Sequence, residues 1–408
     1  MATALSRWVS YLPLGFIALV SWGTWLVRTV MAHRARPVQN DFRTTTSVVV
    51  PVYREDPEIL SLCLDTWVAS GPDELILVVD TADTACLDML GHRVDPDFVD
   101  VHPFPHRGKR SALAEGIRRA TAEVVVLVDS DTAWTPGLLD AVQMPFVDRW
   151  VGGVGTRQVV AARQSSLWRR IASWLLDVRY ADYTPAMGAH GSVPCLSGRT
   201  AAYRRALLTP MLPQLEHEVF LGRECVAGDD GRLTWLVLST GHTTVQQSQA
   251  VAISMFPANL RGFVHQRTRW SRNSYRCYLT AIRHGWLWQQ ALITQITVLQ
   301  ILLTPVTMGV AVFCLGRAVW IHTPAVAALF VAWALVGRGI RGLSHLRQHP
   351  QDLPLLPVVM LTIVFISLPL KLYAMVTMNR QGWLTRQDNR LGGEAQTRAT
   401  LGTDGFAA

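Results

Sequence analysis

The chain has 408 residues, 50% of them hydrophobic and 17% charged, and its mean hydropathy is +0.20. This composition excludes both an ordinary soluble domain and a chain made only of membrane helices, and it predicts a soluble domain joined to several membrane segments. The net charge of +8 indicates membrane orientation rather than nucleic-acid binding, because arginines flank apolar stretches and no continuous basic tract occurs. The six cysteines lack Cys-x-x-Cys spacing, which argues against a zinc site or a disulfide framework.

Residues 8–30 are mostly apolar and contain no charged side chain before Arg28. Their length suits one membrane-spanning helix of about 20 residues. A signal peptide is the competing interpretation, but no clear small-residue cleavage site is present, so we favour a transmembrane helix. Arg28, Arg34 and Arg36 follow the apolar stretch, and the positive-inside rule therefore predicts that this end faces the cytoplasm.

Short apolar runs alternate with helical patterns between residues 44 and 260. The expected buried strands are 46–52, 74–80, 99–102 and 124–128. Asp56-Pro57-Glu58 has the sequence of a helix start, and Gly108-Lys109-Arg110 opens a second helix. This alternation predicts an α/β domain with a doubly wound parallel sheet. Glycines at 152, 153 and 155 predict a tight turn between two strands.

Carboxylates stand at the ends of two of these strands. Asp80 ends one strand, and Asp129 and Asp131 follow another with one residue between them. In open α/β sheets, ligands bind at the carboxyl ends of the strands. Two adjacent carboxylates repel one another unless a cation lies between them, and a divalent cation would take phosphate oxygens as its other ligands. The pattern predicts a metal–diphosphate site, although so short a motif also occurs at a polar strand exit.

A second acidic motif, Gly228-Asp229-Asp230, precedes an apolar helix. Acids at such a position also serve as simple helix caps that match the helix dipole. Residues 261–289 then mix cations with aromatic side chains, among them Gln266, Arg269 and Trp270. We interpret this segment as amphipathic interface helices that can lie on a membrane surface, clamp a diphosphate and stack on a sugar.

Residues 290–380 are predominantly apolar and predict a transmembrane or re-entrant region. Its candidate spans are 291–315, 318–336 and 353–378. Three prolines interrupt the last stretch, so we expect it to be re-entrant or to lie at the interface, which would keep the following residues in the cytoplasm. The final segment, 381–408, ends in small and polar residues that predict disorder.

The acidic motifs and Gln266-x-x-Arg269-Trp270 occur in an order that resembles membrane-bound, inverting family 2 glycosyltransferases. These enzymes include the processive hyaluronan, chitin and cellulose synthases. Residues 195–198 and 203–205 resemble the acceptor-side segment of that family, and 382–386 resemble its last block, which ends in W-G-T-R. The chain departs from the family at Leu384, where glycine is usual, and at Arg199, where proline is common.

The resemblance implies a GT-A-type nucleotide-sugar domain followed by α-helical transmembrane segments, and it assigns a role to each matching residue. The donor-binding residues it implies are Tyr53, Asp80, Lys109, Asp129 and Arg269. Asp131 would bind Mg²⁺ or Mn²⁺, and Asp230 would be the general base, with Asp229 as the alternative. The implied acceptor-binding residues are Ser197, Gly198, Gln266 and Trp270, and the implied gating residues are Trp383, Thr385 and Arg386.

The function implied by this resemblance is a processive, inverting transfer from UDP-N-acetylglucosamine, alone or with UDP-glucuronate. The growing glycan would be extruded through the lipid bilayer by a multi-pass plasma-membrane protein with a cytoplasmic catalytic domain. Two alternatives stay open. One is a non-processive enzyme of the ceramide glucosyltransferase type, which shares the same acids but glycosylates a lipid. The other is a membrane scaffold with an inactive nucleotide-sugar domain. Oligomeric state is not specified by the sequence.

Overall fold

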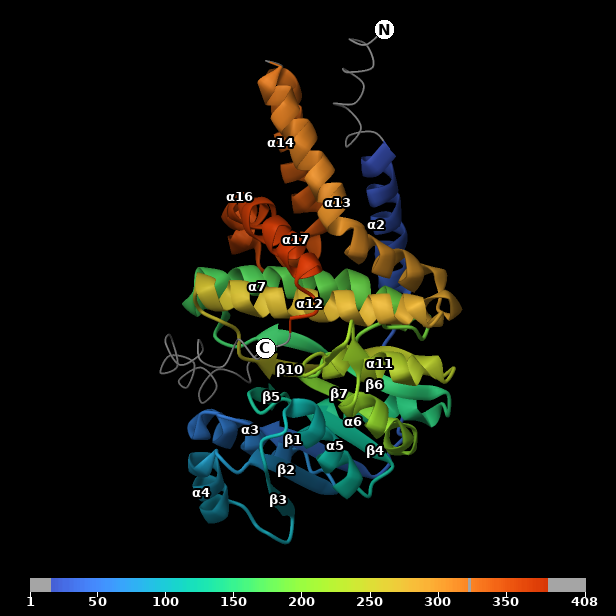
Figure 1. Cartoon of the computed structure of the whole chain (residues 1–408), viewed down its shortest axis with the longest axis vertical. Helices are drawn as coiled ribbons and strands as arrows, with labels where there is room; N and C mark the ends of the chain where they lie inside the picture. Colours follow the sequence, from blue (N-terminus) through green and yellow to red (C-terminus); the bar gives the residue numbers. More distant parts are fainter. Residues whose placement is uncertain (1–15, 322–323, 381–408) are drawn as a thin grey trace.

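The computed structural model describes residues 16–321 and 324–380 (Figure 1). The predicted gating residues Trp383, Thr385 and Arg386 lie outside these residues, and so does the part of the expected N-terminal span before residue 16. The first described element is the helix α2 (Phe16–Arg34).

An eight-stranded mixed sheet forms the centre of the α/β domain, with strand order β3-β2-β1-β4-β7-β6-β10-β5. Its strands are β1 (Thr46–Val52), β2 (Glu74–Asp80), β3 (Val99–Phe104), β4 (Val124–Val128), β5 (Thr132–Trp134), β6 (Val151–Val160), β7 (Thr200–Arg204) and β10 (Thr243–Ser254). β1 to β4 are parallel, which confirms the doubly wound α/β prediction. The sheet is not wholly parallel, because β7 runs antiparallel to both neighbours and β5 runs antiparallel to β10.

Successive residues of β1 point into two separate cores, as expected for a strand buried on both faces. Val48 and Val50 pack into the core that α3 covers, whereas Val49 packs into the core that contains Leu113 and Ile117 of α5. Each fully buried valine contributes about 1.5–3 kcal/mol relative to an exposed one. This two-sided burial explains why the strand reads as a continuous apolar run.

Helices cover both faces of the sheet and continue above it. In the α/β domain they are α3 (Pro57–Ala69), α4 (Thr84–Arg93), α5 (Lys109–Arg119), α6 (Leu138–Gln143), α7 (Leu167–Val178), α8 (Thr184–Gly188), α9 (Arg205–Leu208), α10 (Leu212–Glu216) and α11 (Asp229–Ser239). A small hairpin, β8 (Val219–Phe220) with β9 (Arg223–Glu224), precedes α11.

The glycines at 152–155 do not form the turn that their sequence predicts, because they lie inside β6. An added Cβ at Gly152 would stand 2.6 Å from Cγ1 of Val237, and one at Gly153 would stand 2.8 Å from Cδ1 of Leu196. Glycine within a strand allows such close approach of a neighbouring element. Here it lets α11 and the 193–198 segment pack directly on the sheet.

Two long helices, α7 and α12 (Leu260–Arg283), form a layer between the sheet and the apolar helices (Figure 1). The rings of Trp168 and Phe263 lie 5.3 Å apart and join these helices in one apolar cluster. Asn259 caps α12 by accepting a hydrogen bond from the Gly262 N–H at 2.8 Å, a typical start signal for a helix.

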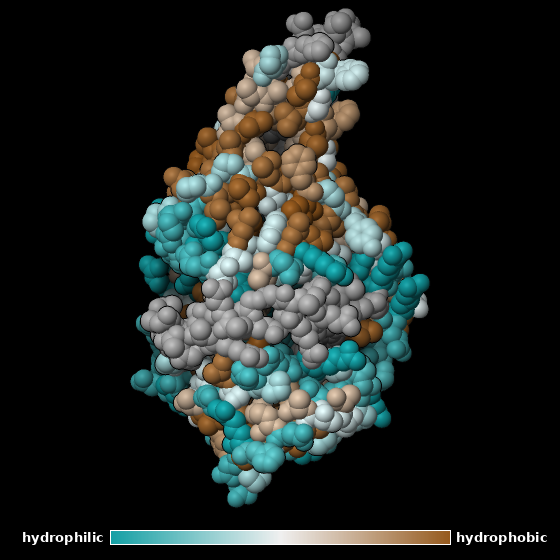
Figure 2. Space-filling view, turned by 90° about the vertical axis from the view of Figure 1, so that its left-hand side faces the viewer, coloured by the Kyte–Doolittle hydropathy of each residue, from teal (hydrophilic) through white to brown (hydrophobic). Residues whose placement is uncertain are grey.

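Three apolar helical segments are long enough to cross a membrane: α13 (Leu292–Trp320), α14 (Pro324–Arg341) and the run Pro350–Val376. Within the described residues, α2 is not among these candidates. Figure 2 shows hydrophobic side chains gathered on the upper part of the molecule and hydrophilic ones on the α/β domain below. A membrane association is therefore indicated. α13 begins one residue and ends five residues later than predicted, and α14 begins six and ends five residues later.

The last apolar segment is helical throughout, although its prolines led us to expect an interruption. It contains the 3₁₀-helix η6 (Pro350–Leu355), α16 (Leu356–Leu361), the π-helix η7 (Thr362–Ser367) and α17 (Leu368–Val376). Pro357 and Pro369 stand in the first turns of α16 and α17, where a missing N–H costs little. The segment therefore departs from a regular α-helix at the π-helix η7 and is not broken. Whether it spans the membrane or is re-entrant stays a prediction.

A buried ion network fastens the loop after α14 to α7. In α15 (Leu343–Gln348), His345 lies 2.7 Å from Asp177 Oδ2 through Nδ1 and 2.9 Å from Asp352 Oδ2 through Nε2. Arg163 and Arg170 both pair with Asp352. Together with His349, Asp177 and His345 also place possible metal-ligand atoms within 4.8 Å of one another, but the arginines nearby make this network a poor host for a cation.

Candidate active site

The Asp129-Ser130-Asp131 motif occupies the turn between β4 and β5. The Asp129 N–H donates to the Arg199 carbonyl at 3.2 Å, and the Thr132 N–H donates to the Asp129 carbonyl at 3.1 Å. The buried Ser130 hydroxyl donates to Glu55 Oε2 at 2.6 Å. These contacts fix the turn from inside, so that the two aspartates flank a serine that is bonded to the protein.

Lys109 joins the two acidic motifs at the start of α5. Its Nζ lies 2.7 Å from Asp129 Oδ1 and 2.9 Å from Asp229 Oδ2. Burial alone would lower the pKa of Lys109, but the charges of Asp129 and then Asp229 raise it above its ordinary value. Residues from β4, α5 and α11 that are distant in sequence therefore form one charged cluster.

Asp229 and Asp230 differ in their surroundings. Burial raises the pKa of both carboxyl groups, but at Asp229 Lys109 and Arg110 together outweigh burial, and its pKa lies below its ordinary value. At Asp230 burial and the neighbouring Asp229 charge act together, and its pKa lies above the ordinary value. Asp230 Oδ1 accepts a hydrogen bond from the Gly231 N–H at 2.8 Å. Asp229 is thus the ion-paired acid, and Asp230 is the one that takes up a proton more readily.

The predicted acceptor residues Ser197 and Gly198 lie against this cluster. An added Cβ at Gly198 would stand 3.3 Å from Asp229 Oδ2 and 3.4 Å from Lys109 Nζ. Ser197 forms a side-chain hydrogen bond with Tyr180. The absence of a side chain at Gly198 keeps the space beside the two carboxylates open.

Asp80 and Tyr53 form a second group at the carboxyl edge of β1 and β2. Asp80 Oδ1 accepts from the Ala82 N–H at 2.9 Å, and Oδ2 lies 2.6 Å from His106 Nδ1. The His106 and Tyr53 rings are 4.4 Å apart. His106 belongs to no recognisable motif, so its contact with Asp80 could not be predicted from its position shortly before Lys109.

Gln266, Arg269 and Trp270 lie along α12 at the i, i+3 and i+4 spacing that puts side chains on one helix face. The Trp270 ring packs edge-on against Phe256, with centroids 6.0 Å apart. Arg199 links this group to the acids, because it lies near Trp270 and interacts electrostatically with Asp131, Asp129 and Arg269. The acidic cluster around Lys109, the Asp80–Tyr53 group and the α12 residues therefore lie at one edge of the sheet.

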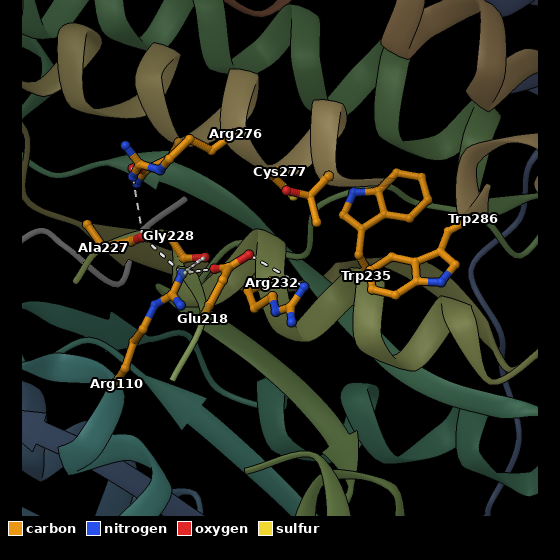
Figure 3. Close-up of a pocket in the computed structure, with 11 residues that line it drawn as sticks. Arg110, Glu218, Ala227, Gly228, Arg232, Trp235, Arg276, Cys277 and Trp286 are labelled. Carbon is orange, nitrogen blue, oxygen red and sulfur yellow. Dashed lines mark hydrogen bonds and ion pairs between the residues drawn. The ribbon is translucent and has the colours of Figure 1, made fainter. Parts of the chain in front are cut away.

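A set of arginines behind the site holds the backbone that leads into Asp229. Arg110 Nη2 donates to the Ala227 carbonyl at 3.0 Å and to that of Gly228 at 3.3 Å, and it pairs with Glu218 at 2.7 Å. Arg276 Nη2 also donates to the Ala227 carbonyl, at 3.4 Å. Figure 3 shows the two guanidinium groups on either side of this backbone, around a small pocket. Sequence reasoning missed these supports, since their targets are carbonyl groups with no side-chain signature.

Residues 43–273, more than half of the chain, match the family model described as Glycosyltransferase like family 2. The chain belongs to this family. It is therefore a glycosyltransferase, and its central sheet with the covering helices forms a GT-A-type domain, as the motif resemblance implied.

Similar proteins agree over most of the chain. An N-acetylglucosaminyltransferase from Azorhizobium caulinodans is 29% identical and covers 84% of this chain and 87% of its own. An N-acetylglucosaminyltransferase from Rhizobium meliloti is 29% identical over 87% of this chain and 84% of its own. A "Type 2 glycosyltransferase" from Pyricularia oryzae is 25% identical over 87% of this chain and 77% of its own.

A solved structure shares the fold. It is a mannosyltransferase from Pyrobaculum calidifontis in complex with GDP-Man and Mn²⁺, which aligns with a TM-score of 0.62 and 21% identity over 89% of this chain and 97% of its own. At this identity the likeness concerns the fold alone.

Proposed function

We propose that this glycosyltransferase transfers N-acetylglucosamine from UDP-N-acetylglucosamine to a hydroxyl of a growing saccharide, with inversion at the anomeric carbon. The observation that carries the proposal is the Lys109–Asp129–Asp229 cluster with Asp230 beside it. Relatives named N-acetylglucosaminyltransferases, at 29% identity over most of the chain, support this choice of sugar.

On the donor side, Lys109 and Arg269 would bind the diphosphate. Lys109 begins α5, where free backbone N–H groups also favour an anion. Arg269 offers a planar, bidentate group that suits phosphate oxygens. Asp80 would hold the uracil or ribose, with Tyr53 packed beside the base.

On the acceptor side, Asp230 would take the proton from the attacking hydroxyl. A base works best when its pKa is close to the working pH, and the raised pKa of Asp230 brings it closer than the lowered pKa of Asp229 does. General base catalysis of this kind contributes about 10²–10⁴-fold to the rate. Trp270 would be the surface on which the acceptor sugar stacks.

Asp131 would hold a divalent cation, Mg²⁺ or Mn²⁺. Its carboxylate is a hard oxygen donor in the turn after β4, where Asp129 and Glu55, which accepts a hydrogen bond from Ser130, supply further carboxylates. These residues fit such a cation, whose preferred ligands are oxygens. When bound, the cation would neutralise charge on the leaving diphosphate.

We further propose that the enzyme is processive and extrudes its product across the plasma membrane from a cytoplasmic catalytic domain. The helix that carries Trp270 is bonded to the end of the last apolar segment: Arg272 Nε donates to Thr377 Oγ1 at 3.1 Å, and Arg276 Nη1 donates to the Met378 carbonyl at 2.6 Å. A product leaving the acceptor surface would therefore meet the apolar helices directly.

The test is sugar incorporation by the full chain in lipid nanodiscs, with each radiolabelled UDP-sugar given alone and in pairs with Mg²⁺ or Mn²⁺. We expect incorporation from UDP-N-acetylglucosamine into a product of many sugars. Label that enters a single lipid-extractable sugar would replace the processive proposal with lipid glycosylation. No incorporation from UDP-N-acetylglucosamine, alone or paired, would overturn the proposed donor.

A further inference from the structure

Two guanidinium groups flank the Trp270 ring. Cζ of Arg199 lies 5.5 Å from the ring centroid, and Cζ of Arg267 lies 5.1 Å from it. Arg199 is only 8% exposed, its Nη2 donates to the Met255 carbonyl at 3.1 Å, and its Cζ lies 3.8 Å from the Phe256 ring. Both arginines are therefore held in place beside the aromatic surface.

Each of these groups has buried N–H donors that no acceptor in the described part of the chain satisfies. Among the described residues, Arg199 Nη1 and Arg267 Nε and Nη2 have no hydrogen-bond partner. Contact with an aromatic face attracts the cation but leaves the in-plane N–H donors unbonded. Buried polar atoms without partners are rare in folded proteins and call for an explanation such as a missing ligand. The side chain of buried Gln266, on the same helix, adds an acceptor, Oε1, that has no partner within residues 16–321 and 324–380.

The charged groups around Arg267 are positive, as Arg267 itself is. Burial and the charges of Arg199 and Arg179 lower the pKa of Arg267 to about 10, and Lys371 of α17 also interacts electrostatically with it. Arg199 does interact with Asp131 and Asp129, but the proposed function uses those acids for the metal and the donor. On the α12 side, the described residues provide no carboxylate to balance Arg267.

We propose that the acceptor saccharide presents an oxyanion, a carboxylate or a phosphate, to Arg199 and Arg267 beside Trp270. This inference rests on the proposed function, in which Trp270 is the acceptor surface. Arginine presents a planar fork of donors that matches such groups in a bidentate manner. A uronate sugar bound beside Trp270 would bring its carboxylate to the in-plane N–H donors of the guanidinium groups that lie over the ring, while Gln266 Oε1 would accept from a sugar hydroxyl.

The position of Arg199 favours the acceptor over a lipid headgroup as the source of the oxyanion. Its carbonyl bonds the N–H of Asp129, and it directly precedes β7. It therefore belongs to the interior of the catalytic domain rather than to the apolar helices. The diphosphate of the donor, in turn, has Lys109 as its own partner in the proposed function.

The experiment compares acceptors for the full chain in phosphatidylcholine nanodiscs, with UDP-N-acetylglucosamine as donor. The acceptors are neutral chitotetraose, a tetrasaccharide of alternating N-acetylglucosamine and glucuronate, and the methyl ester of that tetrasaccharide. We expect kcat/KM to be about 10- to 100-fold higher for the free acid than for its ester, the range of a charge-assisted hydrogen bond.

Variants of Arg267 then test whether this residue causes the preference for the free acid over its ester. Arg267→Gln should bring the ratio of acid to ester close to one by raising KM for the acid, and Arg267→Lys should restore part of it. The Kd for UDP-N-acetylglucosamine should not change. Arg283→Gln, which removes an exposed arginine from the last turn of the same helix, is the matched control and should keep the full ratio. Since Nε and Nη2 of Arg267 are buried and have no hydrogen-bond partner among the described residues, its replacement by glutamine should leave Tm unchanged or raised.

Several results would overturn the inference. Equal kcat/KM for acid and ester, or an Arg267→Gln variant that lowers both alike together with Tm, would assign Arg267 a structural role. If anionic phosphatidylglycerol nanodiscs, rather than acceptor charge, determine the effect of Arg267→Gln, the oxyanion belongs to a headgroup. Transfer without any charge preference defeats this inference alone, whereas no transfer to any acceptor defeats the proposed function as well.

Discussion

The donor and acceptor sides of the candidate site treat charge in opposite ways. On the donor side, Lys109 lies between Asp129 and Asp229 at hydrogen-bond distance from both. On the acceptor side, Arg199 and Arg267 face Trp270 with buried donors that the described residues do not satisfy. Paired charges hold a geometry before substrate arrives, whereas unpaired ones gain most from a ligand. The contrast suggests that the donor side is preformed and that the acceptor side is completed by the saccharide.

The largest expected effect comes from removing the proposed base. Asp230→Asn should lower the transfer rate by about 10²–10⁴-fold and leave the Kd for UDP-N-acetylglucosamine nearly unchanged, because Asp230 is not the acid that pairs with Lys109. Initial rates and equilibrium donor binding check this. Asp88→Asn, an exposed acid on α4, is the control. A variant that loses donor affinity and rate together would move Asp230 to the donor side.

Breaking the donor-side pairing should cost stability as well as activity. Lys109→Met leaves two carboxylates without their cation, and removing one partner of a buried ion pair costs about 3–5 kcal/mol. The unfolding midpoint in nanodiscs should fall by several degrees. Arg93→Met removes an exposed pair with Asp65 and should cost about 0–1 kcal/mol. Equal losses in the two variants would contradict the account of a preformed donor side.

Filling the space beside the acids should disturb their geometry. Gly198→Ala places a Cβ 3.3 Å from Asp229 Oδ2, so the carboxylates must shift by a few tenths of an ångström. A misplacement of 1 Å in a catalytic constellation can cost about 10²-fold, so this smaller shift should lower kcat/KM by less than that. Gly91→Ala meets nothing within 4 Å and should keep full activity. Normal kinetics in Gly198→Ala would mean that no reacting group uses this space.

A smaller effect separates the two acids by pH. The base must be ionised, so activity should fall as pH decreases through the pKa of Asp230, which lies above the ordinary value because of burial and the charge of Asp229. Asp229→Asn removes that charge and should shift the acid limb of the kcat/KM profile to lower pH. Complete loss of activity in Asp229→Asn at every pH would assign the base to Asp229 instead.

Elements governed by local pattern were predicted well from the sequence. β1, β2 and β4 begin and end where their apolar runs do, because strands buried on both faces leave a continuous signal. The antiparallel β7 and the strand position of Gly152 and Gly153 were missed, since both depend on pairings between distant segments.

In the candidate site, too, local motifs could be predicted and contacts between distant residues could not. Acidic motifs at strand ends could be found by position and family resemblance. The Lys109 bridge, the His106 contact with Asp80 and the Arg110 support of the 227–228 backbone could not be found, because each joins residues far apart in the chain. Arg199 was visible only as a departure from the family pattern, and its unbonded donors became apparent only from the packing around it.

The most direct test of the central claim is the configuration of the new linkage. In the proposed reaction, one acceptor hydroxyl, deprotonated by Asp230, displaces the diphosphate in a single step, which inverts the α-configured donor. We therefore predict that ¹³C NMR of the product from UDP-N-acetylglucosamine labelled at C1 shows only β linkages. An α-linked product would contradict direct displacement, and with it the role of Asp230 as the base.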